Sequence, residues 1–330
     1  MNTCVSLEGH AEDQTKLPQS YSGSGYAVIA ICVVLSMLFM KTGILSFLFL
    51  MPLGYAVLVS GSIWITFFAA AAVNIVLSLV LHLNVAHNVS LWMDIFYFTV
   101  ILFMFNWIMG GTNLRTAYRL ILASLAGAAA FIILIMNNSS DTSFYAVLND
   151  MAELLASILA NSSANGEAVQ QAFTQERVLE LIKSISLRGG AFISMLFIFF
   201  LNRQITLTAM WLIKRKRHEI SFIQFFAPSY SIWMFSGALA AILLSSMVKS
   251  ELLEILSWNV LTVSAVLFLA QGAGIIMHLF TRFTHVTRII ASVLAMFLLL
   301  SPVNTIAIAA VLILGIAETW LPIRIKKVES

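Results

Sequence analysis

The stretch FFLNRQITLTAMWLIKRKRHE, residues 199–219, places one arginine inside an apolar run that ends in four consecutive basic residues. Arg203 lies eleven residues before Lys214, which corresponds to about 16 Å of helix, or about half of the ~30 Å hydrocarbon core of a bilayer. If Lys214 marks the inner interface, Arg203 lies near the middle of the membrane. An arginine there costs about 2.5–3.5 kcal/mol to insert, so such residues usually face other helices or water and indicate function. In the alternative, residues 189–202 alone cross a thinned bilayer, 204–217 form an interfacial helix, and Arg203 lies at the headgroups.

The composition of the chain indicates an integral membrane protein. Hydrophobic residues make up 60% of the 330 residues and charged residues 10%, against about 45–50% and about 25% in soluble domains. A soluble domain could not bury this much apolar surface, so lipid must cover it. The net charge of +3 is too small to indicate a nucleic-acid partner. The two cysteines, Cys4 and Cys32, do not indicate a disulfide framework.

Apolar runs along the chain predict an all-α, polytopic membrane helix bundle. Several runs are shorter than the ~20 residues that a perpendicular span needs, and the first two and last two could form re-entrant hairpins instead. We therefore expect eight to ten spans. The ten runs are 26–40, 43–59, 61–81, 91–109, 117–136, 189–213, 230–248, 255–279, 286–300 and 303–319.

The distribution of lysine and arginine predicts the orientation of the bundle. With the N-terminus inside, 12 of the 18 lysines and arginines fall in inner segments and 5 in outer ones, and Arg203 is the remaining one. This bias agrees with the positive-inside rule, so we expect both termini to be cytoplasmic. Residues 1–25 do not read as a charged and then apolar leader, so we expect no cleaved signal peptide.

Composition divides the chain into five parts. A polar cytoplasmic tail, 1–25, precedes an N-terminal membrane bundle, 26–136, and a C-terminal membrane bundle, 189–319, precedes a basic cytoplasmic tail, 320–330. Between the bundles, 137–188 repeats apolar residues at helical spacing on both sides of a turn cluster, which predicts an external amphipathic helical hairpin. This hairpin could lie on the bilayer or cap the bundle, or it could form a lid over an outward-facing cavity.

The sequence contains no motif of a catalytic or metal site. It lacks G-x-S-x-G, a P-loop, H-E-x-x-H and C-x-x-C, which are typical of hydrolases, nucleotide-binding proteins, metalloproteases and redox proteins. His82 and His87 are five residues apart, a spacing that does not place two ligands on one helix face. We therefore predict that the protein is not an enzyme and binds neither cofactor nor metal.

A proline interrupts the second predicted span, and polar residues are few in all spans. Pro52 and Gly54 lie within FLMPLGYAVLVSG, residues 49–61. Non-helical backbone at membrane depth needs partners from protein or a water-filled cavity, and transporters place their sites at such breaks, although a simple packing kink is the alternative. For Arg203, Glu318 and Asp94 are candidate counter-charges. The polar residues within the spans are Asn74, Asn106, Arg203, Asn259, Gln271 and Glu318.

Five short motifs together resemble the YybS-like membrane proteins, a bacterial family of unknown function. The motifs are FLMPLGYAVLVSG, LNRQITLTAM, FFAPSYSIW, WNVLTVSAVLFLAQGAGII and GIAETWLPIR. The resemblance implies a bacterial multi-pass protein that is distantly similar to the substrate-binding subunits of energy-coupling factor transporters, without a known substrate. The residues that match the family pattern are Pro52, Asn202, Arg203, Pro228, Trp233, Asn259, Gln271, Gly272, Glu318 and Arg324.

Two functions follow from these observations. In the first, the protein is a non-catalytic transport component of the bacterial inner membrane that lacks its own ATPase and binds a small anionic molecule. The basic loop Lys214, Arg215, Lys216 and Arg217 would then dock a coupling protein or lipid. In the second, the protein is a structural or assembly scaffold whose polar residues lock helices together. The candidate ligand-binding residues are Arg203, Asn202, Gln271, Asn259, Pro52 and Glu318.

Overall fold

The described part of the protein is almost entirely helical. The computed structural model describes residues 23–42, 46–84, 91–110, 116–137, 153–154, 157, 175–214, 225–301, 304–321 and 323–324, and it contains no strand in these ranges. Six helices of this part are long and apolar enough to cross a membrane. The prediction of an all-α, polytopic membrane helix bundle is therefore confirmed.

Three shorter apolar helices accompany the six long ones, namely Tyr26–Met40, Ser46–Ser60 and Asn304–Ala317. They fall in the two pairs of runs that the sequence predicted as either spans or re-entrant hairpins. Most of the expected external hairpin, 137–188, lies outside the described residues. Its described end contains the short helix α8, Gln175–Ile185.

The chain forms two compact units. Unit 1 comprises Met1–Arg115 and Ile198–Lys216, and unit 2 comprises Thr116–Phe197 and Arg217–Ser330. The two units follow contacts between residues, whereas the five parts predicted from the sequence follow composition. Helix α5, Thr116–Asn137, belongs to unit 2 although it precedes the external segment, and α9, Ala191–Lys214, begins in unit 2 and ends in unit 1.

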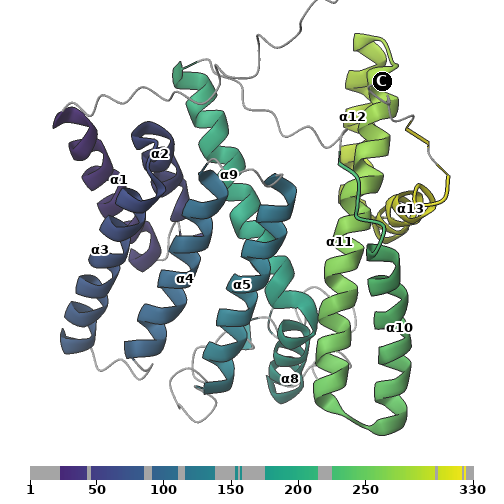
Figure 1. The fold of residues 1–330 in the computed structure, drawn as a ribbon, viewed down its shortest axis with the longest axis horizontal. Helices are drawn as coiled ribbons and strands as arrows, with labels where there is room; N and C mark the ends of the chain where they lie inside the picture. Colours follow the sequence, from purple (N-terminus) through teal and green to yellow (C-terminus); the bar gives the residue numbers. More distant parts are fainter. Residues whose placement is uncertain are drawn as a thin grey trace, which may run out of the picture. The chain divides into compact units, whose positions relative to one another are not determined.

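Unit 1 contains a half-length helix among longer ones (Figure 1). Helix α2 has 11 residues, which is about 16 Å and too short to span a bilayer. It packs against α1, α3 and α4, and most of its residues are buried. The helices of unit 1 besides the end of α9 are α1 Gly23–Thr42, the 3-10 turn Ser46–Leu48, α2 Leu50–Ser60, α3 Ile63–Asn84 and α4 Leu91–Met109.

Pro52 does not interrupt a helix, as the sequence suggested, but lies at its start. It is the third residue of α2, where a backbone N–H would have no intrahelical partner, so proline costs little there. The change in helix type, called the break below, precedes it at residues 46–49, where a 3-10 turn leads into α2. Gly61 ends α2 in the left-handed conformation with a φ of 65°, which glycine adopts without strain.

Unit 2 is built around α11, Glu251–Thr281, which contacts α10, α12, α13 and the turn at Ser186–Gly190. The 31 residues of α11 extend for about 46 Å, which exceeds the ~30 Å hydrocarbon core. The other helices of unit 2, besides α5, α8 and the start of α9, are α10 Ser231–Val248, α12 His285–Leu300 and α13 Asn304–Ala317.

Two glycines allow the backbones of α11 and α13 to touch. A Cβ atom on Gly272 would lie 2.0 Å from the carbonyl oxygen of Val311, and one on Gly315 would lie 1.9 Å from that of Phe268. Small residues of this kind permit close helix packing in membranes, where the hydrophobic effect does not drive helices together. The half-length helix α13 is therefore held to α11 by direct backbone contact.

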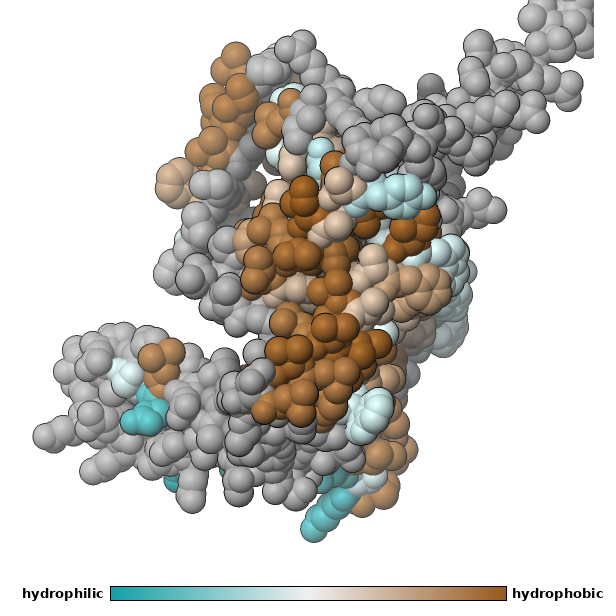
Figure 2. Space-filling model, turned by 90° about the vertical axis from the view of Figure 1, so that its left-hand side faces the viewer, coloured by the Kyte–Doolittle hydropathy of each residue, from teal (hydrophilic) through white to brown (hydrophobic). Residues whose placement is uncertain are grey.

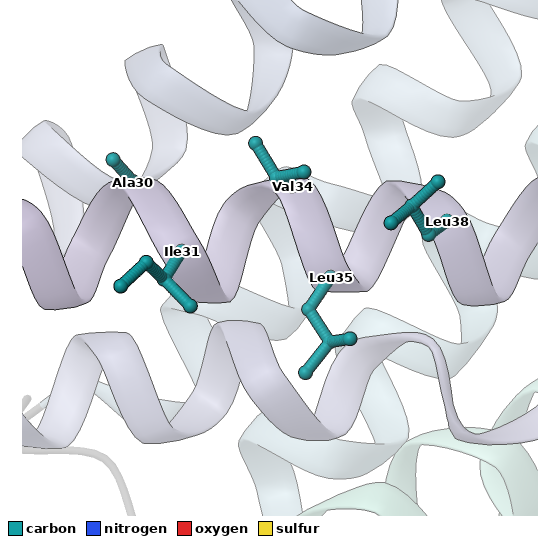
Figure 3. Close-up of a pocket in the computed structure, with 5 residues that line it drawn as sticks. All are labelled: Ala30, Ile31, Val34, Leu35 and Leu38. Carbon is teal, nitrogen blue, oxygen red and sulfur yellow. The ribbon is translucent and has the colours of Figure 1, made fainter.

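The outer surfaces of the helices are apolar, as lipid contact requires. On the face that Figure 2 presents, hydrophobic side chains predominate among the described residues. A shallow groove on α1 is lined by apolar side chains alone, at Ala30, Ile31, Val34, Leu35 and Leu38 (Figure 3). Because it offers no polar group, this groove suits an acyl chain or an apolar side chain and not a polar solute.

Candidate functional site

Two polar side chains of α9 bond to the backbone at the break and at the start of α2 in unit 1. Asn202 donates a hydrogen bond from Nδ2 to the carbonyl oxygen of Phe47 at 2.8 Å, and one turn later Thr206 donates to that of Met51 at 3.2 Å. Asn202 also donates to the carbonyl of Ile198 within α9. Irregular backbone in a membrane protein needs such internal partners because lipid offers none. Asn202 and Thr206 therefore make the break possible.

A second side chain reaches the break from α1. The hydroxyl of Ser36, which is fully buried, donates to the carbonyl oxygen of Phe49, the residue that precedes α2. The ring of Phe49 packs edge-on against Phe98 of α4, with a centroid distance of 6.3 Å. Side chains of α1, α4 and α9 thus meet the break at one level of unit 1.

A glycine brings α2, α4 and α9 together just beyond the break. A Cβ atom on Gly54 would lie 2.9 Å from Oγ1 of Thr206 and 3.1 Å from the ring of Phe105. The ring of Phe105 also stacks near Phe199 at 6.2 Å. The interruption that the sequence indicated at Pro52 and Gly54 is therefore a buried half-helix packed against the polar middle of α9.

Arg203 is buried within a continuous helix. Its side chain belongs to the middle of α9, which runs from Ala191 to Lys214, and 9% of the residue is exposed. The alternative with separate helices before and after Arg203 is not observed. Asn202 and Arg203 are neighbours in sequence and project about 100° apart around the helix. A positive charge is thus enclosed next to the residue that holds the break.

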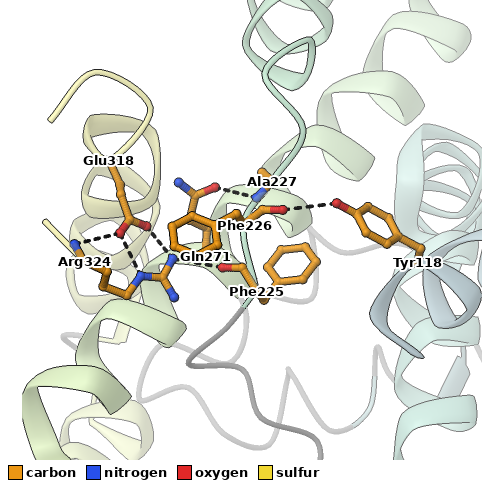
Figure 4. A network of polar contacts seen from close by, with 7 residues as sticks. All are labelled: Tyr118, Phe225, Phe226, Ala227, Gln271, Glu318 and Arg324. Atoms are coloured by element: carbon orange, nitrogen blue, oxygen red, sulfur yellow. Dashed lines mark hydrogen bonds and ion pairs between the residues drawn. The ribbon is translucent and has the colours of Figure 1, made fainter. Parts of the chain in front are cut away.

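In unit 2, Glu318 and Arg324 form a buried ion pair (Figure 4). Arg324 binds both carboxylate oxygens, with Nη2 2.5 Å from Oε2 and Nε 2.7 Å from Oε1. The side chains of Arg324 and Glu318 are only 4% and 1% exposed. A bidentate pair of this kind is geometrically specific and strong in a low-dielectric interior. The expected basic tail, 320–330, therefore contributes Arg324 to the interior of unit 2.

The ion pair belongs to a network around the extended segment 225–227 (Figure 4). Arg324 donates to the carbonyl of Phe225 at 2.9 Å, and its guanidinium lies 4.3 Å from the ring centroid of Phe226. Gln271 of α11 accepts from the backbone N–H of Ala227 at 2.8 Å. Tyr118 of α5 donates to the carbonyl of Phe226 at 3.1 Å. Gln271 and Glu318 are thus engaged with groups of the protein itself.

Asn259 holds a kink between α8 and α9. It donates from Nδ2 to the carbonyl of Leu187 at 2.6 Å, next to Gly189, whose φ is 107°. Arg188 and Glu254 form an ion pair at 3.2 Å beside the same kink. Asn259 and Gln271 are twelve residues apart on α11, or about 18 Å, so they do not line one site.

The candidate residues therefore fall into three places. Pro52, Asn202 and Arg203 lie around the break of unit 1, Gln271 and Glu318 lie in the network of unit 2, and Asn259 lies at the kink. In the basic loop, Lys214 ends α9, and Arg215, Lys216 and Arg217 lie outside the described residues. Sequence reasoning missed Ser36, Thr206 and Tyr118 as partners of backbone carbonyls. The four-residue spacing of Asn202 and Thr206 was a usable signal, because it places both on one helix face.

The chain matches no protein-family model, no curated protein and no solved structure. Among the described residues, no group of three or more His, Cys, Asp or Glu side chains could hold a metal ion.

Proposed function

We propose that this integral membrane protein is a non-catalytic transport component that binds a small anionic molecule at the break in unit 1. The observation that carries the proposal is the buried Arg203. It adjoins Asn202, whose side chain bonds to the backbone just before the short helix α2. An arginine is expensive at membrane depth and usually marks a ligand or ion path. Broken helices with polar partners are where many transporters bind their substrates.

The electrostatics of this region favour a negative group. Arg203 carries a positive charge, and the N-terminus of α2, next to the break, carries the positive end of a helix dipole. The described residues of unit 1 contain a single acidic residue, Asp94, in the first turn of α4. An anion would therefore gain more than a cation from entering this region.

The protein would act with a second component. Its sequence has no nucleotide-binding motif, so another chain or an ion gradient would supply the energy. The basic loop Lys214–Arg217 is a docking site for such a chain, in keeping with the resemblance to YybS-like proteins. We place the protein in a bacterial cell membrane with both termini in the cytoplasm, as the lysine and arginine bias indicates.

Thermal unfolding of the purified protein in lipid nanodiscs tests this function. The wild type is screened against small anions, cations and neutral solutes at constant ionic strength, since a ligand that binds the folded state raises Tm. We expect one or more anions to raise Tm, and Arg203→Gln to lose that response. Arg282→Gln removes a positive charge from an exposed position at the end of α11 and should respond like the wild type.

Two results would overturn the function. Either no solute raises the Tm of the wild type, or Arg203→Gln responds as the wild type does. Arg203→Met, which also removes the charge, replaces the glutamine variant if that variant does not fold.

A structural or assembly scaffold is the second candidate, and the contacts of unit 2 favour it. Asn259, Gln271 and Glu318 each bond to groups of the protein itself, as expected of residues that lock helices together. For a scaffold, Arg203→Gln would lower Tm while no solute raises the Tm of the wild type.

A further inference from the structure

The interface between α3 and α4 has a regular pairing of residues. Thr66 donates from Oγ1 to Oδ1 of Asn106 at 2.9 Å, and Asn106 donates from Nδ2 to the carbonyl of Leu102 at 2.7 Å. Next to this pair, Phe67 packs edge-on against Phe103 at 5.2 Å. Thr66 lies in the first turn of α3 and Asn106 in the last turn of α4, so the two packed helices are antiparallel, and this pair gives their register.

From this register we infer that Asn74 and Thr99 lie at the same level of the interface. Asn74 follows Phe67 by seven residues, and Thr99 precedes Asn106 by seven, a step that returns a side chain to nearly the same helix face. Asn74 is 0% exposed. Neither polar atom of its side chain, nor Oγ1 of Thr99, has a hydrogen-bond partner among the described residues. One polar pair of this interface is thus bonded directly, and the other is not.

The pair of Asn74 and Thr99 lies at the level of the helix break. Phe98, the neighbour of Thr99, packs against Phe49 at 6.3 Å, and Phe49 is the residue that precedes α2. Asn202, next to Arg203, bonds to Phe47 in the same break. The pair and the buried arginine are therefore at similar depths in unit 1.

We propose that Asn74 and Thr99 are ligand-binding residues that receive a hydroxyl group of the transported molecule. An amide both donates and accepts hydrogen bonds, and so does a threonine hydroxyl. A hydroxyl group of the ligand can satisfy both kinds of atom, whereas a carboxylate only accepts and an ammonium only donates. Together with Arg203, this makes the substrate class a small hydroxylated organic anion. The inference rests on the proposed function, because it assigns a substrate class to that site.

The preference for a hydroxyl group has a physical basis. When an analogue lacks the hydroxyl, the amide of Asn74 and the hydroxyl of Thr99 remain buried without its hydrogen bonds. Sites built to bond a hydroxyl reject such analogues strongly, because the polar groups of the site are left unpaired. We expect the plain analogue to bind about tenfold or more weakly.

Matched pairs of anions test the inference by thermal unfolding in nanodiscs. The probes are lactate with propionate, malate with succinate, and glycerol 3-phosphate with propyl phosphate, each titrated at constant ionic strength. For the wild type, we expect one or more hydroxylated members to raise Tm at about one-tenth or less of the concentration that the plain partner needs. Asn74→Leu should bind both members equally, and Thr99→Val should reduce the difference between them.

A matched variant separates binding from stability. Asn106→Leu removes the acceptor of Thr66, so it should lower Tm without changing the preference for the hydroxylated anion. In contrast, Asn74→Leu should leave the ligand-free Tm unchanged or raise it, because it replaces an amide that has no partner among the described residues by an apolar group. Thr99→Val remains informative if Asn74→Leu does not fold.

The outcomes distinguish a failure of this inference from a failure of the proposed function. If anions raise Tm through Arg203 but both members of every pair act equally, or if Asn74→Leu retains the preference, the pair does not bind the substrate and water occupies its hydrogen bonds. If no anion raises the Tm of the wild type, the proposed function fails and the inference fails with it.

Discussion

Arg203 in unit 1 and Arg324 in unit 2 are both buried and lie near short apolar helices, but their surroundings differ. In unit 2, Arg324 follows α13 and makes a bidentate ion pair with Glu318, six residues earlier. In unit 1, Arg203 lies in the middle of α9, and its sequence neighbour Asn202 bonds to the backbone of the break. The first arginine closes a network within its unit, whereas the second lies in the middle of a long helix, next to an amide that bonds to the backbone of the break.

This contrast separates two uses of polar residues in a membrane bundle. When an arginine binds both oxygens of a carboxylate, few hydrogen-bonding atoms of the pair remain for a ligand. Uncharged amides and hydroxyls at a break hold the backbone and can still bond to a small molecule. This contrast is the reason that ligand binding is proposed at the break of unit 1 and not at the polar network of unit 2.

Breaking the ion pair of unit 2 has the largest expected effect. Glu318→Gln leaves the buried guanidinium of Arg324 without its counter-charge, which should destabilise the protein by about 3–5 kcal/mol. Denaturant unfolding in detergent micelles measures this change. Glu254→Gln, which removes the partner of Arg188 in a pair whose side chains are 34% and 42% exposed, should cost about 1 kcal/mol or less. If both variants lose the same free energy of unfolding, the buried and the exposed ion pair do not differ in their contribution to stability.

The next largest effect is expected when α13 is pushed away from α11, which should lower the free energy of unfolding by about 1–3 kcal/mol. Gly315→Ala places a methyl group against the backbone of α11, where a Cβ would lie 1.9 Å from the carbonyl oxygen of Phe268. Gly237→Ala on α10 is the matched control, since a Cβ there meets no atom within 4 Å. Thermal unfolding should show a lower Tm for the first variant only. If Gly315→Ala is as stable as the wild type, the contact of the two backbones is not required.

The smallest effect is expected at the break of unit 1. Thr206→Val removes a hydroxyl whose single proton is shared between the carbonyl oxygens of Asn202 at 2.7 Å and Met51 at 3.2 Å. The loss should lower the free energy of unfolding by about 0.5–1.5 kcal/mol. Thr208→Val removes an exposed hydroxyl on the same helix that bonds only within α9, and it should change stability by less. Unfolding of the two variants side by side gives the difference. If the Thr206 variant is at least as stable as the Thr208 variant, α9 does not support the break.

The helical bundle was predictable from sequence because apolar runs and helix length are local properties. The break before α2 was only partly predictable. Pro52 marked its neighbourhood, but proline is acceptable in the first turn of a helix, so the residue itself could not show on which side the break lies. The position of the break depends on Asn202 and Thr206, which are distant in sequence from Phe47 and Met51.

The candidate site could be predicted as a set of residue types and not as a place. Asn202, Asn259 and Gln271 are each an amide within an apolar run, yet they bond to three different parts of the backbone. Only packing between distant helices decides which partner each amide meets. Asn74 was recognised as polar, but its relation to Thr99 depends on the register of α3 and α4, which the pair of Thr66 and Asn106 reveals.

The hydrogen bonds that join α9 to the break have a consequence for biosynthesis. Phe47 and Met51 are each 155 residues earlier than their partners on α9. At about 5–20 residues per second, a ribosome needs roughly 10–30 s to make the intervening chain. During that time the first four helices lack the side chains of α9 that bond to these two carbonyls. A chain that stops before α9 would present an unfinished half-helix to the insertion machinery, and it is a natural substrate for membrane chaperones and proteases.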